Sequence, residues 1–273
     1  MSVSTESFAY VADLVRAQSA IQLGPGKEYL VESRLLPLAR ERGHSGPGAV
    51  DEYVRTVRRG ADPGELTKVV EAMTTNETSW FRDTTPFTVL QQEILPAVRA
   101  DNPGQLRIWS AACSTGQEPY SMIMTLLDGG ERRFSVVATD LATDVLARAG
   151  AGEYSQLEVN RGLPAPMLVK YFDRAGAGWR VKPELRSFVS FAQHNLLGPP
   201  PSGGPFDVVF MRNVLIYFDA ATKRDILVRL RRVMRPGGYL VLGAAETTMG
   251  IDDTWQRVPG SRGPVYRVPG GST

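Results

Sequence analysis

The sequence is poor in the residues that form disulfides and metal centres. Among 273 residues it has one cysteine, Cys113, and two histidines, His44 and His194. One cysteine cannot form an internal disulfide, which fits a reducing compartment. Two histidines exclude a multi-histidine metal site, and we predict that the chemistry of this protein uses no metal.

Long apolar runs and strong charge of one sign are absent too. No uninterrupted apolar run reaches the roughly 18 residues that suggest a membrane span, and no cleavable signal pattern is present. The formal net charge is only +2, without the basic run or face that nucleic-acid binders carry. These absences predict a cytoplasmic protein that neither inserts into membranes nor binds nucleic acid.

The apolar residues that are present, 42% of the chain, are enough for a real core. In the first 75 residues they recur only at helical spacing, so we predict an all-helical domain over residues 1–75. Two apolar helical faces can be identified, one formed by Phe8, Val11, Ala12 and Val15, the other by Leu66, Val69, Val70 and Met73. Two further helices are predicted over Tyr29–Arg42 and Val50–Arg58.

From residue 104 onward, strand patterns alternate with helix patterns. The segment Phe206–Met211 is almost continuously apolar, as expected for a strand covered on both faces. The alternation predicts a doubly wound, mainly parallel α/β sheet over residues 76–273. The predicted strands are Leu106–Ser110, Phe134–Thr139, Phe188–Ala192, Phe206–Met211, Tyr239–Gly243 and Val265–Val268, and the predicted helices include Pro119–Leu127 and Thr222–Met234, the latter behind a capping-box variant.

One segment, residues 153–187, is too long for an ordinary crossover between a helix and a strand. It contains a predicted helix over Met167–Phe172, followed by a glycine-rich stretch and a short strand pattern at Trp179–Val181. We therefore predict a small inserted subdomain with a hairpin beside the sheet.

The stretch Arg107–Ser121 is the most informative part of the sequence. An apolar strand enters a turn of small residues, and the turn enters a helix. Small side chains at the head of a strand let a nucleotide-type ligand approach the backbone. Asp140 ends the next predicted strand, where such folds hold ribose hydroxyls. The glycine fingerprint is incomplete, so a plain tight turn stays open as the alternative, with Cys113 as a packed residue.

A second polar stretch, Asn76–Asp83, lies at the predicted domain junction and interleaves polar side chains with Trp80 and Phe81. Such junctions commonly carry ligand contacts. The alternative is structural: Thr84 or Thr85 caps a helix that begins near Pro86, and the two aromatic side chains fill an interdomain core.

Five motifs together resemble one protein family. They closely match, in order and spacing over essentially the whole chain, the CheR family of chemoreceptor glutamate methyltransferases. The resemblance implies a Rossmann-like S-adenosylmethionine-dependent methyltransferase fold, with S-adenosylhomocysteine as product and cytoplasmic chemoreceptor helices as acceptors. The motifs are Asn76–Arg82, Trp109–Ser121, Ala138–Leu141, Arg212–Phe218 and Arg235–Gly238.

The resemblance also implies roles for single residues. Glu118 is expected to pair with the ammonium group of the methyl donor, and Asp140 is expected to accept the ribose hydroxyls. Arg82 and Tyr217 are expected near the transferring methyl group. The other implied cofactor contacts are Asn76, Thr78 and Arg82 along the pocket, Asn195 and Leu196 at the adenine, and Arg212 with Asn213 at the mouth of the pocket.

Structural readings of some of these residues remain open. Leu196 is also compatible with plain core packing, Arg212 with an ion pair at a strand end, and His194 with a packed or hydrogen-bonded ring. A glutamate acceptor, with a pKa of about 4.3, is already ionised at neutral pH, so its attack on a sulfonium methyl group needs no general base. The scarcity of histidine agrees with such chemistry.

Receptor docking is the least determined part. Some family members hold a peptide at the receptor C-terminus through a glycine-rich loop that is longer than Arg174–Val181, so we predict no dependence on such a pentapeptide. The helical domain offers arginines to an acidic receptor helix, although interleaved acids also fit an ordinary solvated face. These arginines are Arg34, Arg40, Arg55, Arg58 and Arg59.

Two rival functions remain open at this stage. One is a methyltransferase of the same fold that acts on another carboxylate. The other is a signalling module that binds the cofactor without catalysis, against which the joint presence of Arg82, Glu118, Asp140, Asn213 and Tyr217 argues. We expect the protein to be associated with receptor assemblies.

Overall fold

The computed structural model describes residues 3–60 and 63–270. The chain forms two compact units. The first extends to Thr75 and also includes Tyr217–Asp219, and the second contains Asn76–Ile216 and continues from Ala220.

The first unit contains helices joined by loops, with no strand within residues 3–60 and 63–75. Its first helix begins behind Ser4, whose hydroxyl accepts the Ser7 N–H at 3.3 Å and so satisfies one free donor of the helix start. Apolar residues at helical spacing, such as Val11 and Val15, are fully buried. The predicted helices are confirmed, as α1 (Thr5–Ser19), α2 (Glu28–Glu41), α3 (Ala49–Gly60) and α4 (Pro63–Ala72).

A buried carboxylate connects three helices of this unit. Glu65 of α4 accepts a hydrogen bond from the Tyr53 hydroxyl of α3 at 2.8 Å and pairs with Arg42 just after α2. The Arg42 hydrogen bond lowers the pKa of Glu65, and burial raises the pKa of Tyr53. Arg34 is also internally engaged, because it donates to the Met73 carbonyl oxygen at 2.6 Å. It therefore joins α2 to the chain that follows α4.

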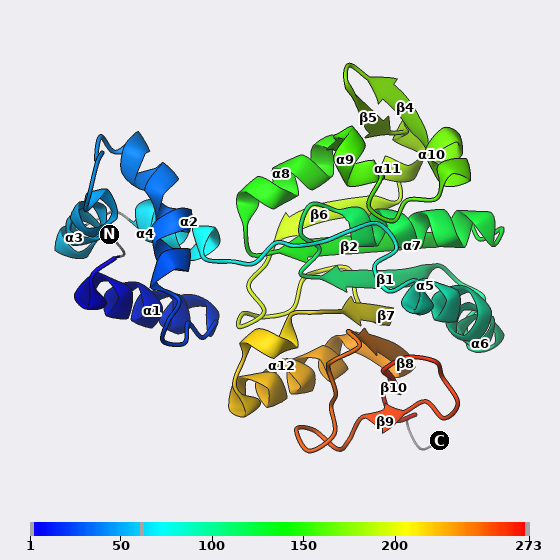
Figure 1. The fold of residues 1–273 in the computed structure, drawn as a ribbon. Helices are drawn as coiled ribbons and strands as arrows, with labels where there is room; N and C mark the ends of the chain where they lie inside the picture. The colour runs from blue at the N-terminus through cyan, green and yellow to red at the C-terminus, as the bar shows by residue number, and fades with distance from the viewer. Residues whose placement is uncertain (1–2, 61–62, 271–273) are drawn as a thin grey trace. The chain divides into compact units, whose positions relative to one another are not determined.

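The second unit is built on a seven-stranded sheet with the order β6-β2-β1-β7-β8-β10-β9, which Figure 1 shows from β6 at the top to β9 at the bottom. The pairs from β6 to β8 are parallel, and β10 is antiparallel to both its neighbours. The predicted mainly parallel sheet is confirmed. Its strands are β1 (Leu106–Ala111), β2 (Phe134–Asp140), β6 (Val189–Gln193), β7 (Phe206–Met211), β8 (Met234–Leu242), β9 (Gln256–Arg257) and β10 (Val265–Arg267).

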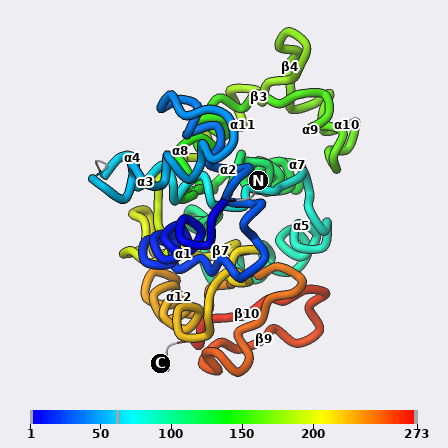
Figure 2. The backbone as a smooth tube through the Cα atoms, turned by 60° about the vertical axis from the view of Figure 1, so that its left-hand side comes forward, coloured from blue at the N-terminus to red at the C-terminus, as the bar shows by residue number. Residues whose placement is uncertain are grey.

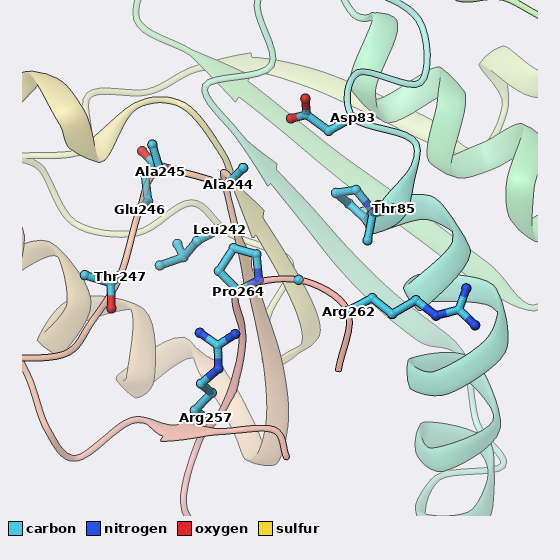
Figure 3. Close-up of a pocket in the computed structure, with 12 residues that line it drawn as sticks. Asp83, Thr85, Leu242, Ala244, Ala245, Glu246, Thr247, Arg257, Arg262 and Pro264 are labelled. Atoms are coloured by element: carbon cyan, nitrogen blue, oxygen red, sulfur yellow. The ribbon is translucent and has the colours of Figure 1, made fainter. Parts of the chain in front are cut away.

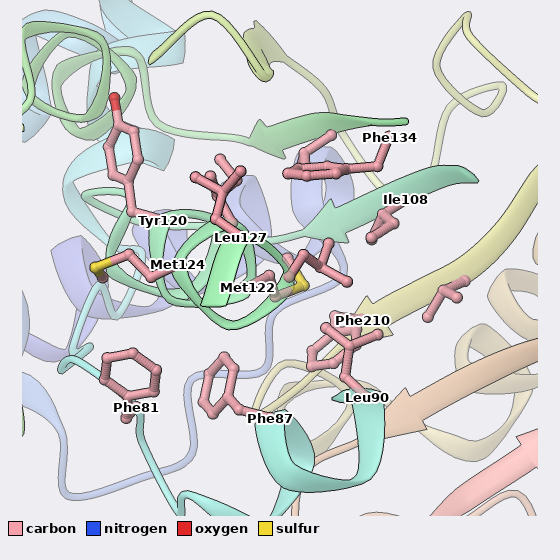
Figure 4. Close-up of a cluster of buried hydrophobic side chains, with 14 of the residues drawn as sticks. Phe81, Phe87, Leu90, Ile108, Tyr120, Met122, Met124, Leu127, Phe134 and Phe210 are labelled. Atoms are coloured by element: carbon pink, nitrogen blue, oxygen red, sulfur yellow. The ribbon is translucent and has the colours of Figure 1, made fainter. Parts of the chain in front are cut away.

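Helices cover both faces of this sheet. Ile108 and Phe210 belong to one large core with the helices around Phe87 and Met122, as Figure 4 shows, whereas Trp109 lies with Ile226 of α12. Alternate strand residues thus point to opposite helical layers. The helices are α5 (Thr85–Val89), the π-helix η1 (Leu90–Ile94), α6 (Leu95–Asp101), α7 (Gln117–Asp128), α8 (Thr143–Ala151), the 3-10 helix η2 (Leu215–Tyr217) and α12 (Ala220–Val233).

Trp80 and Phe81 belong to the core of the second unit. The Trp80 ring makes edge contacts with Tyr154 at 4.8 Å and Phe172 at 5.3 Å between centroids, and Phe81 packs on Phe87. The alternative of an interdomain core is therefore corrected to a core within the second unit. The alternative of a capping threonine is not met at Thr84, which precedes α5 without a side-chain capping hydrogen bond.

The predicted insertion with a hairpin is confirmed. A separate antiparallel sheet has the order β3-β5-β4, and its β4 strand lies at the top of the view in Figures 1 and 2. Only Gly176 and Ala177 lie between β4 and β5. The elements are β3 (Glu153–Tyr154), α9 (Gln156–Val159), α10 (Ala165–Tyr171), β4 (Phe172–Ala175), β5 (Gly178–Val181) and α11 (Pro183–Arg186).

Two differences from the prediction concern β8 and α12. The strand predicted at Tyr239–Gly243 begins earlier, at Met234, so the motif Arg235–Gly238 is part of β8, which pairs with β7 across a register shift between Phe206 and Val208. A bulge of this kind absorbs the left-handed Gly237 without ending the strand. Helix α12 begins at Ala220, so Thr222 lies inside its first turn and is not its cap.

Among the residues described, no helix is both long enough and apolar enough to cross a membrane.

Candidate active site

The turn between β1 and α7 is tightly bent and lined by small residues. Ala112, Ser114 and Gly116 all have positive φ, at 63°, 50° and 92°. A Cβ on Gly116 would lie 2.9 Å from the Ala149 Cβ and 3.1 Å from the Tyr154 hydroxyl, so only glycine fits there. Cys113 within this turn is buried, and burial raises the pKa of its thiol well above the usual value, as expected for a packed residue.

Asp140 stands at the carboxyl end of β2, beside this turn. Its Oδ2 accepts the Ser114 N–H at 2.8 Å, and its Oδ1 accepts the Ala142 N–H at 3.1 Å. The Ser114 hydroxyl donates to the Asn76 carbonyl oxygen at 2.8 Å. The structure therefore brings Asn76, Ser114 and Asp140 together, although they are far apart in the sequence.

Glu118 and Arg212 form the charged centre of the site. The Arg212 guanidinium, with a side chain only 1% exposed, lies 3.0 Å from Glu118 Oε2 and 2.7 Å from Asp83 Oδ2. It also donates to the Arg82 carbonyl oxygen at 2.9 Å, and Ser110 Oγ donates to Glu118 Oε1 at 2.8 Å. The ion pair at a strand end, left open above for Arg212, is thus present.

Burial raises the pKa of Glu118 above its ordinary value of 4.5, while Arg212 and Ser110 act in the opposite direction. Desolvation is the largest of these effects because a buried carboxylate loses its hydration. The site therefore favours a further positive group near Glu118, since such a group would compensate the buried negative charge.

The segment before α5 lies beside this charged centre. Arg82 donates to the Glu77 carbonyl oxygen at 3.0 Å and remains partly exposed. Phe81, Asp83 and Thr84 have positive φ values of 48°, 66° and 36°. Such strain in residues other than glycine concentrates at functional segments. Thr78 is partly exposed in the same irregular segment.

Glu246 organises the backbone of the site, although the sequence analysis did not predict it. Its carboxylate accepts four backbone N–H groups, from Asn213 at 2.8 Å, Val214 at 2.9 Å, Leu215 at 2.7 Å and Gly243 at 2.7 Å. It thereby holds Asn213 in a left-handed conformation with φ of 59°. The available signal was an acid three residues after a glycine at a strand end, which matches no known cofactor motif.

Asn195 and Leu196 follow β6. The His194 N–H donates to the Asp140 carbonyl oxygen at 2.8 Å, which places both residues next to the Asp140 strand end. The Asn195 side-chain oxygen accepts the Leu197 N–H at 3.0 Å. Leu196 lines a space of about 10 Å³ with Trp109, so it also packs against the sheet.

His194 is packed and hydrogen-bonded. Its ring makes an edge contact with Trp109 at 5.5 Å between centroids, and its Nε2 lies 2.9 Å from the Pro199 carbonyl oxygen. Burial lowers its pKa below the ordinary value of 6.5. These contacts agree with the structural reading of this histidine.

Tyr217 is the predicted site residue that belongs to the helical unit and not to the second unit. It ends η2, shortly after Asn213 in the chain. Its carbonyl oxygen accepts the Gln22 N–H at 3.3 Å. Tyr217 takes part in none of the contacts described above for the other predicted site residues, and Thr78 is placed only by its segment, between Asn76 and Arg82.

A cavity of about 530 Å³ opens beside this centre. Its lining begins at Asp83 and Thr85 and continues over Leu242, the last residue of β8, to the loop that contains Glu246. Figure 3 shows these side chains around the cavity, with Arg257 projecting from below. Within residues 3–60 and 63–270, no group of three or more His, Cys, Asp or Glu side chains is placed to hold a metal.

The donor set at the strand ends fits S-adenosylmethionine. Asp140 places a buried carboxylate at the carboxyl end of β2, where doubly wound folds hold ribose hydroxyls. Glu118 supplies a buried negative charge for the donor's ammonium group. The residues present therefore suit both polar ends of the cofactor.

A doubly wound sheet with a carboxylate in the first turn of the helix after β1 and another at the end of β2 defines an α/β enzyme that binds a nucleotide-type cofactor. Comparison with known proteins identifies the family: residues 76–263 match the family "CheR methyltransferase, SAM binding domain", and residues 6–74 match "CheR methyltransferase, all-alpha domain". The chain belongs to the CheR family of S-adenosylmethionine-dependent methyltransferases.

Similar relatives extend over the whole chain. The "Chemotaxis protein methyltransferase 1" of Pseudomonas aeruginosa is 46% identical over 98% of this chain and 100% of its own length. The "Chemotaxis protein methyltransferase Cher2" of Pseudomonas putida is 45% identical with the same coverage. The Escherichia coli "Chemotaxis protein methyltransferase" is 35% identical over 90% of this chain and 86% of its own. The predicted family, enzyme class and cofactor are confirmed.

Proposed function

We propose that this protein transfers the methyl group of S-adenosylmethionine to glutamate side chains of bacterial chemoreceptors, yielding glutamate methyl esters and S-adenosylhomocysteine. The observation that carries the proposal is a pair of carboxylates that follow neighbouring strands: Glu118 in the first turn of α7, paired with Arg212, and Asp140 at the end of β2. The chemotaxis names of its relatives support the choice of acceptor.

In this proposal the chain binds the donor at both ends. Asp140 accepts the ribose hydroxyls, while Glu118 pairs with the ammonium group. Asn195 and Leu196 contact the adenine. The remaining cofactor contacts are Asn76, Thr78, Arg82, Arg212 and Asn213.

The bound cofactor supplies an electrophilic sulfonium methyl group. The protein's task is to hold an acceptor carboxylate in line with it and to exclude water, because opposite charges cancel during transfer and hydration of either partner raises the barrier. Arg82 and Tyr217 are the proposed residues next to the acceptor. The partly exposed guanidinium of Arg82 attracts and orients an anionic acceptor before the methyl group moves.

The proposal assigns catalysis to residues 76–273 and receptor contact to the helical domain over residues 1–75, in a cytoplasmic protein associated with receptor assemblies. The loop between β4 and β5 is short, which supports docking without a receptor C-terminal pentapeptide. Isothermal titration of a free pentapeptide from a receptor tail tests this point, and measurable binding would contradict it.

The reaction is tested with methyl-labelled S-adenosylmethionine and membranes that carry receptors from the same organism. We expect alkali-labile label on the receptor band, and we expect Arg82→Ala to lose it. Arg161→Ala is the matched control, because Arg161 contacts the same residue, Glu77, through an exposed ion pair of 3.2 Å. Tight donor binding without label on receptors would favour another carboxylate acceptor or a non-catalytic signalling role.

A further inference from the structure

We propose that the cavity beyond the end of β8 is a subsite for a second carboxylate of the acceptor protein, with Arg257 as the residue that binds it. The subsite recognises an acidic side chain that flanks the methylated glutamate, so the preferred acceptor is an acidic segment rather than an isolated carboxylate. This inference rests on the proposed transfer to protein glutamates.

The cavity lining carries two carboxylates and two arginines, and they differ in whether their side chains have partners. Its two carboxylates are already satisfied, Asp83 by Arg212 at 2.7 Å and Glu246 by its backbone N–H groups. The side chains of its two cations, Arg257 and Arg262, make no hydrogen bond or ion pair with any residue in the described part of the chain. An anion entering this space would thus meet the Arg257 guanidinium, which no carboxylate of the described residues engages.

The cavity also lies on the other half of the sheet from the proposed cofactor residues. The strand order reverses between β1 and β7, and ligands of such sheets bind at the carboxyl ends on the two sides of this point. The proposed cofactor residues Glu118 and Asp140 follow β1 and β2, whereas the cavity lies at the end of β8. Asp83 belongs to the cavity lining and to the Arg212 cluster, so the two regions are contiguous.

Backbone pairing determines where Arg257 points. Arg257 lies in β9 directly opposite Tyr266 of β10, and residues directly opposite each other in an antiparallel pair have their side chains on the same face of the sheet. The buried Tyr266 hydroxyl is 3.0 Å from Thr247 Oγ1 on the cavity wall. Figure 3 shows the Arg257 guanidinium directed toward Pro264 and Leu242, whereas the Arg262 side chain extends away from Glu246 and Thr247.

The size and the remaining lining suit a side chain from a protein. Leu242, Ala244, Ala245 and Pro264 give the wall small or apolar surfaces, which can contact the methylenes of a glutamate while its carboxylate reaches Arg257. A volume of about 530 Å³ lies within the usual range of ligand pockets.

The test compares Arg257→Gln, Arg257→Lys and the matched control Arg262→Gln, which removes the same charge from the same rim. Steady-state transfer to a soluble cytoplasmic fragment of a receptor from the same organism gives kcat and KM, and calorimetry gives the Kd of S-adenosylmethionine. We expect Arg257→Gln to raise the KM for the fragment about tenfold, as loss of one charged hydrogen bond implies. Its kcat and donor Kd should remain near those of the wild type, Arg257→Lys should be intermediate, and Arg262→Gln should resemble the wild type.

A second measurement separates this inference from the proposed function. Binding of hexaglutamate is measured at low ionic strength in the presence of S-adenosylhomocysteine. If the wild type methylates no receptor, the proposed function fails. The subsite would still be supported if Arg257→Gln, but not Arg262→Gln, binds hexaglutamate more weakly than the wild type. Equal effects of Arg257→Gln and Arg262→Gln, no effect of either, or no hexaglutamate binding by the wild type would overturn it.

Discussion

Replacement of Arg212 by methionine is the most demanding test of the charged centre. The substitution keeps much of the side-chain volume but leaves Glu118, whose side chain is 13% exposed, without its positive partner. Asp83 is 45% exposed, so its share of the pairing is screened by water and contributes little. Breaking a buried pair costs about 3–5 kcal/mol, and we expect the lower end, about 3 kcal/mol, because Glu118 can take up a proton instead.

The loss of stability in Arg212→Met should depend on pH, and the pKa of Glu118 determines the direction. The pKa of Glu118 is already raised above 4.5 by burial, and Arg212 acts to lower it. Without Arg212 the folded protein binds this proton more tightly, so the loss of stability is largest at neutral pH. It shrinks as the pH falls toward 4.5 through the folded-state pKa.

Urea unfolding followed by circular dichroism at several pH values measures the effect. Arg148→Met is the matched control, because its ion pair with Glu158 is 2.7 Å long but exposed and should be worth less than about 1 kcal/mol. Adding Glu118→Gln to Arg212→Met should restore part of the stability and remove the added pH dependence. Equal losses in Arg212→Met and Arg148→Met, or no restoration in the double variant, would refute this account of the buried pair.

Three further expectations concern other parts of the molecule. Asp140→Ala should weaken S-adenosylmethionine binding in calorimetry by about 1.5–3 kcal/mol, whereas Asp144→Ala, an exposed neighbour, should not; near-wild-type affinity would show that the ribose is misplaced. Tyr217→Phe should leave donor binding intact and slow methyl transfer, and unchanged turnover would assign Tyr217 to packing. Glu65→Gln should lower the stability of the helical unit by about 1–3 kcal/mol in thermal unfolding, because the Arg42 and Tyr53 contacts lose their anion; an unchanged melting temperature would contradict it.

Elements with one dominant signal were predictable from the sequence. The limits of β7 agree with the prediction, because a continuously apolar run bounded by turn residues has one interpretation. The start of β8 was not predictable, since Arg235–Gly238 has the local chemistry of a turn and only pairing with Phe206 extends the strand. Tertiary pairing overrode the local preference at this position.

The site residues likewise divide into those that a local motif predicts and those that only the folded chain reveals. Glu118 and Asp140 follow strands in recognisable motifs, and the structure brings their surroundings together as the motifs imply. Glu246 lies in no such motif, and its role depends on how the β7 and β8 loops meet in space. A Cβ on Gly243 would come within 2.7 Å of the Glu246 carboxylate, which is a constraint that only the folded chain reveals.

The ring of N–H groups around Glu246 has a consequence for the entropy of ligand binding. Asn213, Val214 and Leu215 are immobilised by a carboxylate of the protein itself. The conformational freedom of this loop is therefore lost when the chain folds and not when a ligand arrives. A ligand that meets such a rigid wall gives up less free energy to ordering, which leaves more of its contact energy for affinity and alignment.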